Sequence, residues 1–331
     1  VPEEYGGLEL DLVTYLLVLE EISWGDASVA LGMAIHSGPV TFLLRSYGGE
    51  EQKERYLPAM ASGKKVGAFA LSEADAGSDA RSLRATYRRE GEEWVLNGTK
   101  KWVTNGDLGG VVVVFAREED GDAISAFLVE PRAPGYGVGK REVTMGLAGS
   151  HTVEVELDNA RLSGSALLGE EGTGFPQAMA ALDIGRLGIA AQALGIARAA
   201  FEHAREYASE RVQFGKPLAQ FQATRFKLAE MATRLTAARA LTRCAAEALE
   251  GRGDVEAPQA GAMAAMAKLV ASESAVWITD EAVQIFGGYG YMRDYPVEKL
   301  LRDAKGAEIY EGTNEIMRLV IARDALRDVG A

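Results

Sequence analysis

The periodicity of apolar residues changes twice along this chain, and this change constrains the fold more than any other feature. In residues 8–62 apolar side chains recur three and four positions apart, which predicts helices. Residues 65–160 instead contain short runs rich in β-branched residues, separated by glycine, asparagine and aspartate. From about residue 172 the helical spacing returns in long segments rich in alanine and leucine. The order is helical, then β, then helical, which predicts an α+β fold.

This pattern predicts three domains. They are an N-terminal helical domain (1–64), a middle antiparallel β domain (65–165) and a C-terminal helical bundle (166–331). The helices are expected at 12–22, 29–44, 50–60, 174–209, 219–250, 256–286 and 313–328. The strands are expected at 66–71, 82–87, 94–96, 111–116, 124–129 and 152–157, with turns at 90–93, 97–98 and 105–106.

The net charge of −13 argues against two classes of partner, since a negative field repels nucleic acid and anionic membranes. We find no stretch of about eighteen apolar residues that predicts a membrane span, and no signal peptide. The only cysteine, Cys244, is expected to be a small buried helical residue, and a chain without disulfides suits the cytoplasm. The three histidines stand far apart without metal-ligand spacing, so we expect no metal site.

Two segments of the β region carry groups suited to a ligand. The first leaves a strand and enters a Gly/Ser/Asp turn, where the hydroxyls of Ser72 and Ser78 suit an anion or a polar ring edge. A plain surface turn is the alternative. In the second, Trp102 and Thr104 alternate along a strand, so they share a face that suits a flat ring. The alternative is a core tryptophan.

Two helical segments carry the remaining candidates. Arg211 precedes a Gly-Lys-Pro break and can grip phosphate, or is an ordinary basic residue at a helix end. A glycine-rich stretch at 287–290 offers bare backbone to a ligand. Near the end of the chain Thr313 or Asn314 caps the last helix, and Glu311 lies in the loop before it. A glutamate there is either a solvated charge or a base.

In this order, the four segments resemble those of the acyl-CoA dehydrogenases, and 182–195 resembles the short-chain (butyryl) class most. The resemblance runs from Val1 to about residue 326, although the first few dozen residues of the family are missing. It implies the three-domain fold predicted above, a homotetramer with one FAD per subunit, and a place in the β-oxidation of fatty acids. It further implies an acyl-CoA substrate and an electron-transferring flavoprotein as partner.

The resemblance also implies roles for individual residues. Glu311 matches the base that removes the α-proton while the β-hydrogen leaves as hydride to flavin N5, giving a trans-2-enoyl-CoA. Some relatives carry the base one residue before Arg186, where this chain has Gly185, so Glu311 is the expected base. The residues matching FAD-binding positions are Phe69, Leu71, Ser72, Gly77, Ser78, Trp102, Thr104, Arg211, Gln213, Phe214, Gln284, Gly288, Thr313 and Glu315. Those matching substrate-binding positions are Ser78, Asp183, Arg186, Tyr310 and Gly312.

The chain departs from the family pattern at several positions. Ala74 and Asp75 replace a common Pro-Gly, Gln213 stands where Thr or Ala is usual, and Ala148 replaces a usual Arg. These departures leave the acyl chain length and branching open. Three alternatives stay open as well: an acyl-CoA oxidase, a catalytically silent CoA-binding relative and a helical interaction protein.

Overall fold

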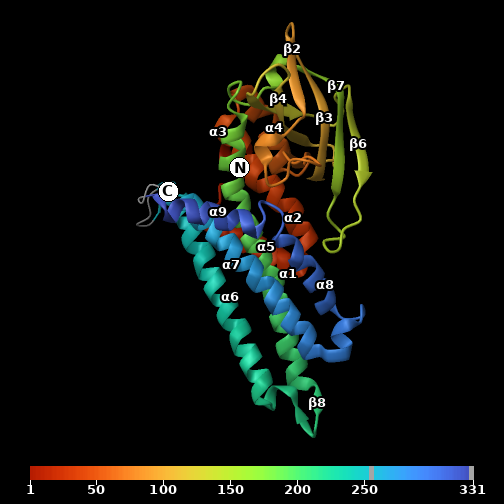
Figure 1. Ribbon diagram of the computed structural model, residues 1–331, viewed down its shortest axis with the longest axis vertical. Helices are drawn as coiled ribbons and strands as arrows, with labels where there is room; N and C mark the ends of the chain where they lie inside the picture. Colours follow the sequence, from red (N-terminus) through yellow and green to blue (C-terminus); the bar gives the residue numbers. More distant parts are fainter. Residues whose placement is uncertain (253–256, 328–331) are drawn as a thin grey trace. The chain divides into compact units, whose positions relative to one another are not determined.

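A computed structural model of the chain describes residues 1–252 and 257–327 (Figure 1). Its contacts group into two compact units. Unit 1 comprises residues 1–10, 32–143 and 149–185, and unit 2 comprises 11–31, 144–148 and the described residues from 186 onward. Unit 1 holds the sheet and unit 2 holds most of the long helices, so the α, β, α order expected from the sequence is confirmed.

One group of helices in unit 1 precedes the sheet in the sequence. It contains a 3-10 turn, η1 (Glu3–Tyr5), the end of α2 (Ala27–Ile35), a π-helical segment η2 (His36–Val40), α3 (Thr41–Tyr47) and α4 (Glu50–Ala61). The helix expected at 29–44 is therefore interrupted. Pro39 cannot donate a backbone hydrogen bond, and Gly38 leaves the helical conformation, so the π-helical segment separates the two helices.

The sheet of unit 1 has seven strands. They are β1 (Gly67–Ala70), β2 (Thr86–Glu90), β3 (Glu93–Thr104), β4 (Val111–Glu118), β5 (Ile124–Val129), β6 (Tyr136–Arg141) and β7 (Thr152–Ser163). Their order is β1-β4-β2-β3-β7-β6, with β5 paired to β4. The expectation of a wholly antiparallel domain is wrong in this respect: β1 and β2 both pair parallel to β4. The other pairings are antiparallel.

The expected turn at 97–98 is also wrong, because Asn97 and Gly98 lie inside β3. The register with β7 shifts there, as in a β-bulge. Gly98 has φ 136°, and a Cβ on it would lie 2.7 Å from the backbone of Ala85, so only glycine fits. The sequence signal marked a bulge rather than a strand end. Two further differences are β6, which was not expected, and the 3-10 turn η3 (Ala80–Ser82) at the start of the expected strand 82–87.

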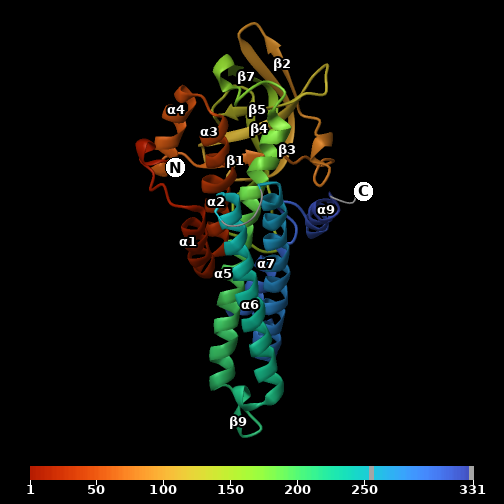
Figure 2. The same cartoon turned by 90° about the vertical axis from the view of Figure 1, so that its left-hand side faces the viewer.

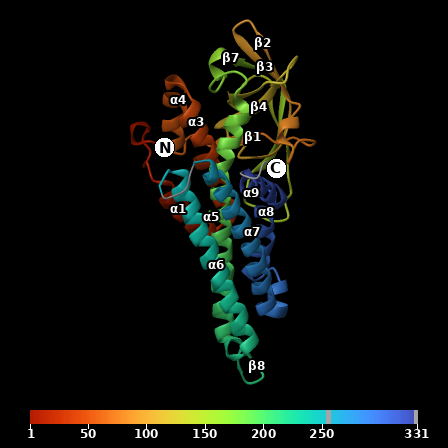
Figure 3. The same cartoon turned by 60° about the vertical axis from the view of Figure 1, so that its left-hand side comes forward.

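Unit 2 is a helical bundle. It contains α1 (Leu12–Gly25), the second half of α5 (Gly174–Glu210), α6 (Gln222–Leu249), α7 (Ala257–Phe286), α8 (Pro296–Ala307) and α9 (Asn314–Ala325). The second half of α5 runs beside α6 and α7 (Figure 2), while α8 and α9 pack on α7 (Figure 3). The short strands β8 (Val212–Gln213) and β9 (Lys216–Pro217) and the 3-10 turn η5 (Leu218–Gln220) join α5 to α6, and η6 (Gly287–Tyr291) follows α7. The helix α8 was not expected from the sequence.

Two expectations about composition need correction. The helical segments 27–47 and 174–210 are each long and apolar enough to cross a membrane by length and composition. However, 67% and 72% of their most apolar windows are buried inside the protein, as for core helices. Cys244, expected to be buried, is exposed on α6. Within the described ranges no group of three or more His, Cys, Asp and Glu side chains is arranged to hold a metal ion.

Candidate active site

Glu311 lies in the short loop between α8 and α9, where the sequence placed it. Its backbone is left-handed, with φ 54°, and Gly312 follows with φ 93°. A side chain in this conformation costs about 1–2 kcal/mol, so surrounding contacts must hold it. Its positive φ requires glycine at residue 312, and a Cβ there would also lie 2.6 Å from Cε of Met317, the flexible end of a side chain that would have to move.

Hydrogen bonds on both sides of the loop hold this conformation. The backbone N–H of Asn314 donates to the carbonyl of Glu308 at 3.0 Å. Thr313 is the N-cap of α9 and accepts from a backbone N–H of the first turn, as one of the two expected caps. The ammonium of Lys268, on α7, donates to the carbonyl of Gly312 at 2.7 Å and to Oδ1 of Asn314 at 2.9 Å.

The Glu311 carboxyl is buried although the residue as a whole is only half-buried. Its Oε2 has no hydrogen-bond partner among the described residues. Burial raises the pKa of Glu311 to about 7, while the positive charges of Arg186 and Lys268 oppose this rise. Burial likewise lowers the pKa of Lys268 to about 8. The carboxyl therefore exchanges its proton near neutral pH, which is the property that a general base needs.

Tyr310 and Arg186, two of the expected substrate residues, belong to the same surroundings. The Tyr310 hydroxyl donates to Oε1 of Gln192 at 2.8 Å, and burial raises the pKa of Tyr310 above its usual value. Gln192 is itself held, because its amide donates to the carbonyl of Ala27 at 2.7 Å. Arg186 is 7% exposed, on the buried face of α5. Unit 2 thus assembles Glu311, Tyr310, Gly312 and Arg186 around one buried carboxyl.

In unit 1 a buried ion pair holds the turn after β1, which carries the expected ligand residues Ser72 and Ser78. The Lys100 ammonium is fully buried, and it donates to the carbonyl of Leu71 at 3.0 Å and to Oε1 of Glu73 at 2.6 Å. Glu73 also accepts the backbone N–H groups of Arg84 and Ala85, at 2.6 and 2.9 Å. Burial alone would raise the pKa of Glu73, but the Lys100 charge and these hydrogen bonds lower it.

The turn after β1 is also hydrogen-bonded to the part of β3 that carries Trp102 and Thr104. The N–H of Lys101 donates to the carbonyl of Ser72 at 2.9 Å, which joins the two segments. Trp102 follows at a second shift of register in β3, with φ 57°, and is 54% exposed. Its expected alternative as a core residue is therefore wrong. Trp102 and the half-buried Thr104 flank the buried Val103, so both point away from the core.

Three of the expected FAD-binding residues line one pocket in unit 2. The pocket has a volume of about 580 Å³ and contains Arg211, Gln213 and Gly288. The guanidinium of Arg211 lies 5.3 Å from the centre of the Tyr289 ring, which also lines the pocket. Phe214 is 95% exposed. Its backbone has φ 50°, and it lies with the exposed Gln284 outside this pocket lining.

The other expected residues lie at the surface or half-buried. Gly77 and Ser78 are exposed in the turn after β1, and Phe69 packs against the Phe115 ring with centroids 5.1 Å apart. Asp183 is half-buried on α5. Glu315 is exposed, and hydrogen bonds from its own backbone N–H and from Thr313 lower its pKa.

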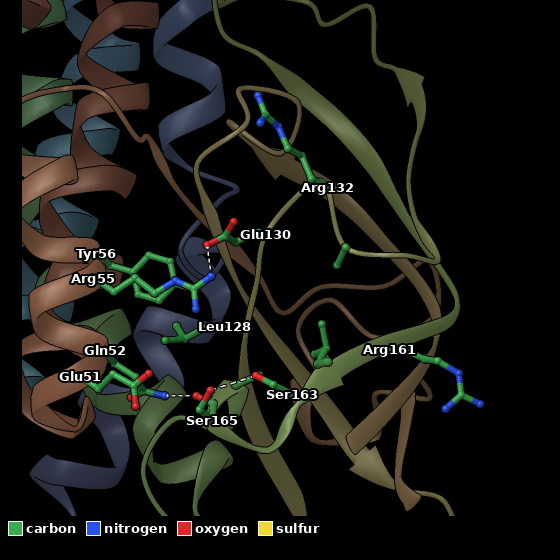
Figure 4. Close-up of a pocket in the computed structure, with 13 residues that line it drawn as sticks. Glu51, Gln52, Arg55, Tyr56, Leu128, Glu130, Arg132, Arg161, Ser163 and Ser165 are labelled. Carbon is green, nitrogen blue, oxygen red and sulfur yellow. Dashed lines mark hydrogen bonds and ion pairs between the residues drawn. The ribbon is translucent and has the colours of Figure 1, made fainter. Parts of the chain in front are cut away.

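A second pocket, of about 240 Å³, lies in unit 1 and contains no expected site residue (Figure 4). Its Glu130 carboxylate is paired, because it accepts hydrogen bonds from Arg55 and Lys65, both at 2.9 Å. Arg132 and Arg161 point away from the other lining side chains in Figure 4. This pocket is therefore a surface hollow in which the Glu130 carboxylate is already neutralised.

Sequence reasoning missed three charged residues of these sites: Lys268, Lys100 and Glu73. A detectable signal exists for Lys268, which stands among alanines of α7 that are themselves buried, at 264, 265, 267 and 271. A lysine that interrupts an otherwise apolar helix is buried only with hydrogen-bond partners. The local sequence does not identify these partners, because they lie more than 40 residues away in the chain.

Comparison with known proteins agrees with this arrangement. The chain matches the acyl-CoA dehydrogenase N-terminal domain at 1–64, the middle domain at 68–160 and the C-terminal domain at 172–326. It is 51% identical to an acyl-CoA dehydrogenase of Bacillus subtilis, over 98% of this chain and 85% of that protein.

Two solved structures are similar throughout. Butyryl-CoA dehydrogenase of Megasphaera elsdenii has a TM-score of 0.94 and 42% identity, over 98% of this chain and 86% of that chain. A chain from work on the electron transferring flavoprotein of Acidaminococcus fermentans and flavin-based electron bifurcation has a TM-score of 0.95 and 44% identity, over 99% and 86%. The expected resemblance and three-domain fold are thereby confirmed, and this chain belongs to the acyl-CoA dehydrogenase family of flavoprotein oxidoreductases.

Proposed function

We propose that this enzyme oxidises a short-chain acyl-CoA to the trans-2-enoyl-CoA, with Glu311 as the base that removes the α-proton. The observation that carries the proposal is the state of the Glu311 carboxyl. Its Oε2 is buried without a hydrogen-bond partner among the described residues, and burial raises its pKa to about 7. A carboxylate without a partner is free to accept a proton from a substrate, and a pKa near 7 makes it basic enough to do so.

Two fixed cations set how basic the carboxyl is. Arg186 and Lys268 both favour the ionised form of Glu311, and burial favours the neutral form. The balance leaves a substantial fraction ionised at neutral pH while keeping the proton affinity well above that of an ordinary glutamate. A base positioned in this way typically contributes about 10²–10⁴-fold to the rate.

Each unit by itself contains residues that suit a part of the FAD that the family uses. In unit 1 an exposed Trp102 indole suits a flat ring, and the half-buried Ser72 and Thr104 carry hydroxyls that suit its polar edges. In unit 2 the pocket with Arg211 and bare glycine backbone suits an anionic, phosphate-bearing group. Bound FAD would supply the acceptor for the hydride, which no protein side chain can provide.

The substrate and partners follow from the family relationship. Tyr310 and Gly312 are the chain neighbours of Glu311, and the charge of Arg186 acts on its carboxyl, which supports their proposed contact with the acyl-CoA. Ser78 and Asp183 are proposed to contact the CoA moiety. The short-chain class is supported by the likeness to butyryl-CoA dehydrogenase. We assign an electron-transferring flavoprotein as electron acceptor and a homotetramer as the assembly, on the same ground.

Glu311→Gln tests the proposal, because glutamine keeps the size of the side chain but cannot take the proton. We expect flavin reduction by butyryl-CoA, followed anaerobically by the loss of flavin absorbance, to slow by at least about 10²–10⁴-fold. FAD content and butyryl-CoA binding should stay unchanged. Glu206→Gln, at an exposed glutamate of α5, is the matched control and should reduce its flavin at the wild-type rate.

If Glu311→Gln bleaches its flavin within a few-fold of the wild-type rate, Glu311 is not the base. If the purified wild-type protein is folded, colourless and unable to take up FAD, the whole assignment fails. Stoichiometric hydrogen peroxide during turnover in air would overturn the choice of electron acceptor.

A further inference from the structure

A fully buried lysine, whose charge acts on Glu311, lies behind the catalytic loop. Lys268 is on α7, and its side chain is 0% exposed. Among residues 1–252 and 257–327, no carboxylate lies within ion-pair distance of its ammonium. Burying an ammonium group is costly unless hydrogen bonds replace its hydration. The acceptors of these hydrogen bonds therefore indicate the role of Lys268.

Within the described part of the chain, the ammonium donates its hydrogen bonds to the segment that follows Glu311. Nζ donates to the carbonyl of Gly312 at 2.7 Å and to Oδ1 of Asn314 at 2.9 Å. Ser272, one helical turn further along α7, donates to the same Oδ1 at 3.1 Å. Thus α7 fixes the two residues on either side of the N-cap Thr313.

This attachment acts on a strained backbone. Glu311 and Gly312 are consecutive residues with positive φ, 54° and 93°, and an ordinary side chain rarely adopts this conformation. If the Gly312 carbonyl rotated away, the buried ammonium would lose one of its two acceptors, which is costly for a buried charge. The Lys268–Gly312 hydrogen bond therefore resists relaxation of the loop and holds the Glu311 carboxyl at one position.

We infer that Lys268 is a positioning residue, which clamps the Glu311 loop through Gly312 and Asn314 and places a fixed positive charge behind the Glu311 carboxyl. The inference rests on the proposed function, because it assigns to Lys268 the control of a base. The charge effect has the expected direction, since Lys268 favours the ionised form of Glu311. The clamp and the charge are separate contributions that different variants can separate.

Other charged groups near Lys268 and Glu311 also affect their titration, and they stay unchanged in the variants tested below. Arg186, from α5, faces both Glu311 and Lys268. Glu308 and Glu315, at the two ends of the loop, act on Lys268. The Tyr310 phenol lies next to Asp303 and Glu311. Arg186 stays in place in every variant below, so a change in the titration of Glu311 reports on Lys268.

The experiment measures the rate of flavin reduction by butyryl-CoA from pH 5 to 9 for wild type and three variants of the FAD-loaded enzyme. Lys268→Met removes the charge and the donors, Lys268→Gln keeps one amide donor, and Lys268→Arg keeps the charge. Lys227→Met is the matched control, because Lys227 of α6 pairs with Glu281 and does not touch the loop. Hydrogen exchange of a peptide covering residues 308–316 is followed in parallel.

For Lys268→Met and Lys268→Gln we expect the midpoint of the pH profile to rise by about one pH unit or more, because an opposite charge has been removed. Lys268→Arg should return the midpoint to the wild-type value. The maximal rate should fall by about tenfold or more in Lys268→Met, and KM should change much less. Hydrogen exchange should accelerate in 308–316 only. Lys227→Met should match wild type in every measurement.

An unchanged midpoint in Lys268→Gln would show that Lys268 has only a structural role, and would overturn the inference. So would hydrogen exchange that accelerates uniformly over the whole chain. Should Lys268→Met not fold, Lys268→Gln and Lys268→Arg decide the question. The proposed function fails by a different result, namely rapid flavin reduction in Glu311→Gln, so the two failures are distinguishable.

Discussion

Replacing Glu311 by glutamine should stabilise this enzyme relative to wild type, by an amount that grows as pH rises from about 4.5 and is complete above about pH 7. Burial raises the pKa of Glu311 to about 7 in the folded protein, whereas an ordinary glutamate titrates near 4.5. Between these two values the folded protein binds a proton that the unfolded chain has lost. The free energy of unfolding therefore falls as pH rises through this window, and the loss is complete above about pH 7.

The magnitude follows from the same two values. One pH unit corresponds to about 1.36 kcal/mol, so ionised Glu311 costs the folded state about 3 kcal/mol above pH 7. Glutamine is neutral in both states and does not bear this cost. Relative to wild type, Glu311→Gln should gain about 3 kcal/mol between pH 4.5 and pH 8. Any packing difference between the carboxyl and the amide is independent of pH, so it cancels from this comparison.

Urea unfolding of both proteins at pH 5 and pH 8, with saturating FAD and tryptophan fluorescence as the signal, measures this difference. Glu206→Gln is the control and should follow wild type at both pH values, within about 0.5 kcal/mol. If the stability difference between Glu311→Gln and wild type is the same at both pH values, Glu311 titrates as an ordinary glutamate. The reasoning about its burial would then be refuted.

Three further predictions concern the flavin segments and the pocket. Lys100→Met leaves the buried Glu73 carboxylate unpaired, so the free energy of unfolding measured in urea should fall by about 3–5 kcal/mol. Lys101→Met, at a half-buried residue, is the control and should lower the free energy of unfolding by about 1 kcal/mol or less. Gly98→Ala puts a Cβ 2.7 Å from Ala85 at φ 136°, so it should lower the thermal unfolding temperature by several degrees; an unchanged temperature would contradict the bulge. Arg211→Ala should weaken FAD binding by about ten- to a hundredfold in a fluorescence titration, and unchanged affinity would show that Arg211 is an ordinary surface charge.

Local patterns in the sequence were sufficient for the order of elements. The strand expected at 124–129 and the long helices after residue 172 lie close to their expected bounds. Their apolar spacing can be recognised from the residues of a single segment. Thr313 was one of two expected caps, and it placed Glu311 in the loop before α9. The family motifs added the chemistry of Glu311.

Weak local signals were missed. The strand β6 contains two glycines and two basic residues, so it has little β-propensity, and it forms because β7 offers it an edge. The helix α8 is only 12 residues long, and its proline start was the one clear signal. The Asn97–Gly98 dipeptide signals a turn in isolation, but pairing of β3 with β7 on both sides of it makes it a bulge.

What only the tertiary structure decided is the pairing of residues far apart in the chain. The parallel pairing of β1 with β4 joins strands about 40 residues apart, and no turn between them marks it. In the same way Lys268 reaches Gly312, and Arg186 acts on Glu311, from other helices. The sequence by itself was enough to propose Glu311 as the base, because residue type and local position are local properties. The proton affinity of that base was decided by the fold, because burial and the distance to other charges exist only once the helices are packed.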